Sequence, residues 1–159
     1  MLKKIIKIAL IVLVAAFVIA QFVRPDTTNP TVVDAEALQA STSVPADVQQ
    51  VLARSCNDCH TNQTQYPWYS KVTPFNWYLA NHIADGRRKL NFSVWNTYKA
   101  DKKTKKLEEV CEQVEQGEMP LPSYLWIHRD AFLSESDSKV LCDWAKAEGS
   151  RISEETPAN

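Results

Sequence analysis

The five residues Cys56-Asn57-Asp58-Cys59-His60 constrain this chain more than any other stretch, because they spell C-x-x-C-H, the attachment motif of a c-type haem. Two thiols on one helical turn can each add across a vinyl group of the porphyrin, and the next residue can reach the iron as proximal ligand. Thioredoxin-like and zinc sites also use C-x-x-C, but the immediate His and the lack of a second C-x-x-C disfavour both. The motif predicts one covalent haem c on Cys56 and Cys59, with His60 on the iron.

The N-terminal segment, residues 1–23, has the pattern of a secretory signal or a membrane anchor. Lys3, Lys4 and Lys7 precede an apolar run over residues 8–23 that is interrupted by Gln21. Haem attachment of this kind takes place on the outer side of a bacterial inner membrane, so the two features support each other. We expect a periplasmic domain held by an uncleaved helix that spans the inner membrane, with cleavage near Ala20 as the alternative.

The charge of the remaining chain bears on its partners. Without residues 1–20 the chain has 15 basic and 19 acidic residues, a net charge of -4. This balance disfavours nucleic-acid binding. The densest basic cluster, residues 99–106, predicts a solvated helix face, or else a docking patch for an acidic redox partner or for anionic lipid headgroups. A redox partner protein is expected, and its identity is open.

The rest of the chain reads as one small helical domain. Residues 24–43, rich in Thr, Pro, Asn, Asp and Ala, predict a flexible linker, residues 44–150 the haem-binding domain and residues 151–159 a disordered tail. Apolar spacing predicts helices over about 47–60, 74–86 and 102–116 and a fourth capped by Ser134 with Asp137. Gly86, Gly117 and Gly149 are placed as helix C-caps. Strand-like alternation is absent from the sequence, which predicts an all-α, cytochrome c-like fold.

Three residues are candidates for the distal ligand of the haem iron. Met119 is the single methionine besides the initiator, and it lies in a proline-rich loop of the kind that presents thioether ligands. His82 and His128 are the rivals, and either would give a bis-His haem. Aromatic residues that follow the motif, Trp68 and Trp77 among them, are expected to pack around the ring and shield it from water, although each alone could be ordinary core.

A set of linked motifs resembles the bacterial haem-binding domain family of small monohaem c-type cytochromes, over about residues 45–147. The resemblance is carried by Cys59-His60-Thr61-Asn62-Gln63-Thr64, Tyr66-Pro67-Trp68-Tyr69-Ser70, Gly86-Arg87-Arg88, Asn91-Phe92-Ser93, Trp95, Met119-Pro120, Tyr124 and His128. It implies covalent haem at Cys56 and Cys59, His60 as proximal ligand and, less directly, Met119 as distal ligand. The motif match also favours Arg87 over Arg88 as a partner of the haem propionates, against a plain solvent-facing role for both.

These observations favour an electron carrier over two alternatives. A six-coordinate haem would exchange electrons through its exposed edge without bond chemistry, so the protein would not be an enzyme. A haem peroxidase or a haem-based sensor would need a displaceable distal ligand, and the sequence does not point to one.

Two further cysteines, Cys111 and Cys142, fall on the third and fourth predicted helices. In an oxidising compartment an even leftover pair usually forms a disulfide. The sequence therefore favours a bridge, with two small buried thiols as the alternative.

Overall fold

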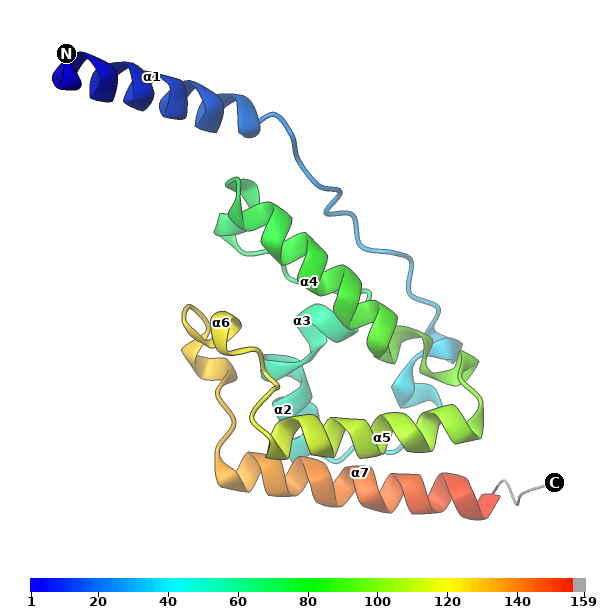
Figure 1. The fold of residues 1–159 in the computed structure, drawn as a ribbon. Coiled ribbons are helices and arrows are strands. Elements are labelled where there is room, and N and C mark those ends of the chain that lie inside the picture. Colours follow the sequence, from blue (N-terminus) through cyan, green and yellow to red (C-terminus); the bar gives the residue numbers. More distant parts are fainter. Residues whose placement is uncertain (156–159) are drawn as a thin grey trace.

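The computed structural model describes residues 1–155, and within that range it contains helices and no strand. This confirms the predicted all-α class. Figure 1 shows α5 and α7 lying antiparallel along one side of the domain, α4 on the opposite side and α2 and α3 between them, while α1 projects away. The helices are α1 (Leu2–Ala20), α2 (Ala46–Ser55), α3 (Asn57–His60), α4 (Phe75–Lys89), α5 (Ala100–Glu115), α6 (Pro122–Leu125) and α7 (Glu135–Glu155).

The main core lies where α2, α5 and α7 meet a 3₁₀ segment, Phe92–Thr97. Trp95, Leu107 and Leu141 are almost completely buried there. Each large apolar side chain removed from water in this way contributes about 1.5–3 kcal/mol. The α5–α7 pair is further joined by a disulfide between Cys111 and Cys142, which confirms the predicted bridge.

The segment predicted as a flexible linker, residues 24–43, is in part fixed to the domain. Leu38 is fully buried in the main core. The Asn96 side-chain amide donates to the carbonyls of Ala35 and Ala37, and the Asn62 amide donates to the carbonyl of Thr31. The burial of Leu38 and these three hydrogen bonds hold this part of the segment against the domain.

Helix ends agree with the sequence in some places and differ in others. Gly117, with a φ of 71°, lies just after α5 and has the predicted capping conformation. Gly86 and Gly149 lie inside α4 and α7, so their predicted C-cap roles are wrong. The backbone of Cys59 packs so closely against Gly86 that a side chain would not fit, which explains a glycine inside α4.

The last helix, α7, begins as predicted and ends later. Ser134 and Asp137 form a reciprocal capping box, in which the Asp137 N–H donates to Ser134 Oγ and the Ser134 N–H donates to the Asp137 carboxylate. The helix continues to Glu155, where a disordered tail was expected from residue 151, because Ile152 is buried and Arg151 pairs with acidic residues one turn away. Residues 156–159 of that tail lie outside the described range.

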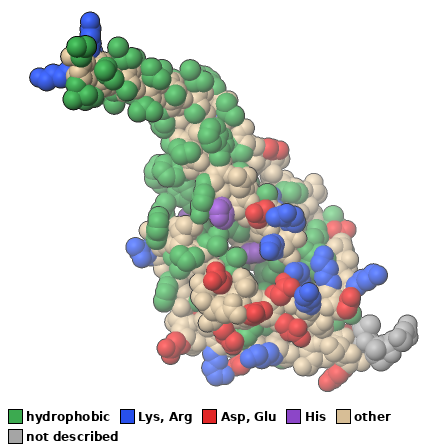
Figure 2. Space-filling view, viewed as in Figure 1, with side chains coloured by type: hydrophobic (Ala, Val, Ile, Leu, Met, Phe, Trp, Pro, Cys, Tyr) green, Lys and Arg blue, Asp and Glu red, His purple; other side chains and the backbone are tan. Residues whose placement is uncertain are grey.

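The N-terminal helix α1 has no buried residue, and Figure 2 shows its apolar side chains covering the part that projects from the domain. Within residues 1–155, no helix is both long enough and apolar enough to cross a membrane. The predicted membrane-spanning anchor is therefore not confirmed.

Candidate functional site

The C-x-x-C-H motif occupies a short turn of helix between two elements. The expected single helix over 47–60 is broken at Cys56, whose φ of −127° ends α2 and starts α3. The backbone N–H groups of Cys59 and His60 both donate to the carbonyl of Cys56, at 3.1 and 3.0 Å. This single turn brings together the two thiols and the imidazole that the sequence predicted as one site.

The imidazole of His60 is oriented by a backbone carbonyl. Its Nδ1 lies 2.9 Å from the carbonyl oxygen of Leu90, the residue that follows α4. Because a carbonyl can only accept, Nδ1 carries the proton and Nε2 keeps a free lone pair, which is how metal-binding histidines are usually held. Burial lowers the pKa of His60, so the ring is neutral and suited to ligate a metal.

The two motif cysteines are free thiols in a desolvated environment. Burial raises the pKa of Cys56 to about 12, and burial together with the neighbouring Asp58 raises that of Cys59 to about 11. At neutral pH both side chains are protonated. Cys111 and Cys142, in contrast, are bonded to each other in the disulfide.

A small cavity opens beside Cys59 at the meeting point of α3, α4 and α6. Polar and aromatic side chains predominate in its walls, together with two aliphatic ones, and it is lined by Asp58, Cys59, Thr64, Gln65, Pro67, Tyr69, Leu79, Ile83, Tyr124 and His128. Its volume is about 10 Å³, so in this form of the chain it has room for no more than a water molecule.

The polar groups of this cavity form two hydrogen-bonded pairs. Tyr69 Oη lies 2.7 Å from His128 Nε2, and Tyr124 Oη donates to the Asp58 carboxylate at 3.0 Å. The rings of Tyr124 and His128 stack with a centroid separation of 4.1 Å. Burial raises the pKa of both tyrosines, and Asp58 adds to the effect. The sequence analysis gave no role to Asp58, which accepts the hydrogen bond from Tyr124 and lines the cavity. Its position between the two cysteines of the motif was the one indication that it lies at the site.

The three candidate distal ligands lie in different surroundings. Met119 is half-buried in the loop after α5, where its N–H donates to the carbonyl of Gln113, and it does not line the cavity beside Cys59. His128 does line that cavity. His82 lies on α4, with Nδ1 2.8 Å from the carbonyl of Tyr78.

The guanidinium of Arg87, the predicted propionate partner, is hydrogen-bonded to other residues of the chain. It donates to the Thr61 carbonyl, to Thr64 Oγ1 and to Asn29 Oδ1, all at 2.8–2.9 Å. These bonds hold the loop that follows His60 against α4 and link α4 to the segment of residues 24–43. Arg88 is exposed and pairs with Asp85. The geometry therefore gives Arg87 a positioning contact that the sequence did not indicate.

The two tryptophans expected around the ring are surface residues. Trp68 is 75% exposed, and its ring meets Tyr69 edge-on. Trp77 is 38% exposed and donates its indole N–H to the carbonyl of Val23. Neither lines the cavity beside Cys59.

The basic cluster of residues 99–106 is partly neutralised within the domain. Lys102 lies over the ring of Tyr98, Lys103 donates to Asn96 Oδ1, and Lys106 pairs with Glu109. Of these three lysines, Lys106 is the one in an ion pair within the described part of the chain.

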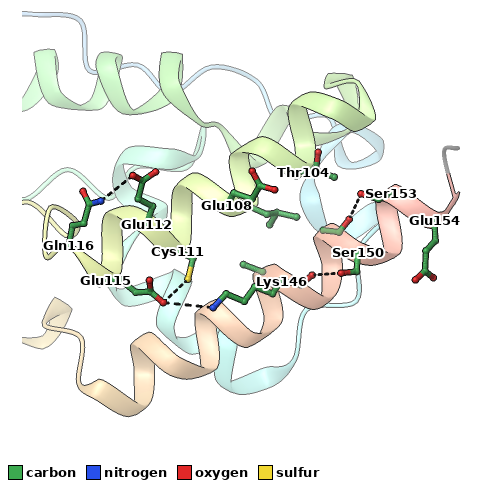
Figure 3. Close-up of a pocket in the computed structure, with 13 residues that line it drawn as sticks. Thr104, Glu108, Cys111, Glu112, Glu115, Gln116, Lys146, Ser150, Ser153 and Glu154 are labelled. Atoms are coloured by element: carbon green, nitrogen blue, oxygen red, sulfur yellow. Dashed lines mark hydrogen bonds and ion pairs between the residues drawn. The ribbon is translucent and has the colours of Figure 1, made fainter. Parts of the chain in front are cut away.

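A larger groove, about 690 Å³, lies away from the motif between α5 and α7. Figure 3 shows three acidic residues of α5 along it, Glu108, Glu112 and Glu115, of which Glu115 faces Lys146 on α7. Cys111, Glu115 and Cys142 lie close together beneath it, but the disulfide uses both sulfurs and leaves no thiolate for a metal.

The donor set beside α3 fits a haem. A neutral imidazole with a free Nε2 and two unpaired thiols on the same turn are the donor groups to which a haem can attach. The fold and the site together define a small helical haem-binding protein. The sequence model of the haem-binding domain family matches residues 15–147, and the chain belongs to that family. No curated protein and no solved structure matches the chain.

Proposed function

We propose that this protein carries one haem c, bound through thioether bonds to Cys56 and Cys59, and serves as an electron carrier on the periplasmic side of a bacterial inner membrane. One observation carries the proposal. Of the two cysteine pairs, Cys111 and Cys142 are joined, whereas Cys56 and Cys59 stay free on the same helical turn as an imidazole held for ligation.

His60 is the proposed proximal ligand. The Leu90 carbonyl fixes its tautomer and increases the basicity of Nε2. When bound, the haem iron supplies reversible one-electron oxidation and reduction. Leu79, Ile83 and Tyr69 would exclude water from one side of the group, and a low-polarity surrounding of this kind raises a haem potential.

Met119 is the proposed distal ligand, with His128 as the alternative that the cavity lining favours. Either would complete six-coordination and suit electron transfer rather than catalysis. Ready binding of carbon monoxide to the reduced protein would instead support the peroxidase or sensor alternative.

Residues 1–23 are the proposed export signal, with α1 retained as the attachment to the inner membrane. The lysines ahead of its apolar residues support export in this orientation. The redox partner is proposed to be a protein that approaches the haem edge.

Retention of haem under denaturing extraction tests the proposal. The full chain, produced with a periplasmic haem-attachment system, should keep its colour with the polypeptide in acid acetone. Cys56→Ala/Cys59→Ala should lose it, while the matched control Cys111→Ala/Cys142→Ala should keep it. If acid acetone removes the haem from the unmodified protein, the haem is not covalently bound and the proposal is wrong.

A further inference from the structure

An exposed apolar surface lies next to the point where α1 joins the domain. We call it the aromatic face and define it by its exposed residues Trp68, Phe75, Trp77, Tyr78, Trp126 and Ile127. Trp68 and Trp126 are each 75% exposed. A contiguous apolar patch of large side chains on a small domain usually marks an interaction site.

The parts of the aromatic face are held together by polar contacts. Tyr78 Oη on α4 lies 2.7 Å from Ser123 Oγ on α6. Trp68 packs edge-on against Tyr69, and Tyr69 Oη bonds His128, close in sequence to Trp126. The start of α4 and the region of α6 therefore present one surface.

This surface is distinct from the wall of the candidate haem cavity. The cavity is lined from these segments by Tyr69, Leu79, Ile83, Tyr124 and His128. None of them belongs to the aromatic face.

The aromatic face is continuous with the apolar helix α1. Gln21, directly after α1, exchanges two hydrogen bonds with the backbone of Thr73, and Trp77 donates to the carbonyl of Val23. Phe22 and Val23 are exposed between them. Figure 2 shows apolar side chains continuing from α1 onto the adjoining side of the domain.

Exposed cations lie within or beside the three segments that adjoin the aromatic face. Residues 15–25, 66–84 and 119–128 contain no Asp or Glu, although the chain has 19 acidic residues in all. Arg24, Lys71 and Arg129 are exposed within or directly after these segments. The exposed acids that border the segments are Asp26, Asp85, Glu118 and Asp130. Exposed Trp and Tyr with flanking cations are typical of a membrane interface, where rings lie among headgroups and cations meet anionic lipid.

We propose that the aromatic face inserts into the headgroup region of a bilayer that contains anionic phospholipid. Together with α1, this second contact would fix the orientation of the domain relative to the membrane. The inference goes beyond electron transfer and rests on the proposed retention of α1, which an intact mass of the isolated protein checks separately.

Photo-labelling by lipid tests the inference in the full, haem-loaded chain. The protein is reconstituted into vesicles of phosphatidylethanolamine and phosphatidylglycerol with a photoactivatable phosphatidylglycerol, and labelled peptides are identified by mass spectrometry. We expect label in residues 68–78 and 123–129 as well as in 1–23, and none on the exposed face of α7. Label confined to residues 1–23 would overturn the inference whatever the state of the haem.

A variant and a protection measurement sharpen the result. Trp126→Ser/Ile127→Ser changes two exposed side chains and should reduce domain labelling several-fold with labelling of α1 unchanged, whereas the control Val33→Ser, also exposed, should have no effect. Acylation of Lys71 should slow in anionic vesicles relative to Lys139 on α7. Equal rates for the two lysines, or chain-to-chain cross-links through the aromatic face in vesicles and detergent alike, would exclude lipid as the occupant.

Discussion

Gly86 lies directly against the backbone of Cys59. A Cβ placed at position 86 would lie 2.8 Å from the Cys59 carbonyl oxygen and 3.2 Å from the Cys59 Cβ. The absence of a side chain therefore lets α4 approach the turn that holds both thiols. The same helix leads into Leu90, whose carbonyl orients His60, so this one close approach positions two parts of the haem motif.

Gly86→Ala should therefore destabilise the domain. The methyl group meets backbone atoms that cannot rotate away, and overpacking of this kind costs about 1–3 kcal/mol. Urea unfolding should show the loss, and the variant should retain less covalent haem. Gly149→Ala is the matched control, because it lies inside α7 with no atom within 4 Å of the added Cβ. It should be neutral or stabilise by up to about 1 kcal/mol, and equal effects at both positions would contradict the packing argument.

Loss of the Cys111–Cys142 disulfide should lower stability without removing haem. The bond closes a sequence separation of 31 residues, for which loop entropy gives about 3–4 kcal/mol. Cys111→Ala/Cys142→Ala should show a lower midpoint of urea unfolding and unchanged covalent haem. Thiol labelling of the denatured, unreduced protein should find neither residue reactive, and two reactive thiols from this pair would rule out the bridge in solution.

Acid should weaken the contact between α7 and the segment of residues 24–43, which contains Thr42. Burial alone would raise the pKa of the Glu148 carboxyl, but hydrogen bonds from Arg151 and Thr42 hold it below its ordinary value of 4.5. A pKa lowered by folding gives stability that is complete above the unfolded value and is lost as the pH falls through the folded one.

Glu148→Gln should accordingly cost about 1–3 kcal/mol at pH 7, the contribution of hydrogen bonds to a charged group. The difference from the unmodified protein should shrink as the pH falls below about 4.5. Unfolding free energies measured from pH 7 to pH 3 check this, with the exposed Glu154→Gln as control. A difference that is constant with pH would show that the Glu148 charge has no such role.

Local sequence signals were sufficient for much of the fold. The apolar spacing of α5, the Ser134–Asp137 capping box and the turn at Gly117 each depend on residues within one or two helical turns, and all three agree with the structure. The disulfide was favoured because an even leftover pair of cysteines in an oxidising compartment usually bridges, and the structure confirms it.

The remaining features depend on contacts between distant residues. Gly86 looks like a helix end in the sequence, and its reason for being glycine is Cys59, 27 positions earlier. The sequence around Leu38 predicts a linker, and the burial of Leu38 in the main core becomes visible only in the structure. Arg87 was expected to face the cofactor, but its bonds to Thr61, Thr64 and Asn29 become visible only in three dimensions.

The identity of the distal ligand gives the last prediction, and we expect Met119. A thioether favours ferrous iron more than a second imidazole does, and the loop after Gly117 holds Met119 between helix α5 and Pro120. Met119→Ala should open the sixth position, allow carbon monoxide to bind the reduced protein and lower the reduction potential. It should also remove the weak near-infrared band of sulfur-ligated ferric haem. His128→Ala should leave that band in place while breaking the bond to Tyr69, and His82→Ala, a change outside the cavity, should leave both the band and the bond. The opposite pattern, an unchanged spectrum in Met119→Ala and an open iron in His128→Ala, would assign a bis-His haem.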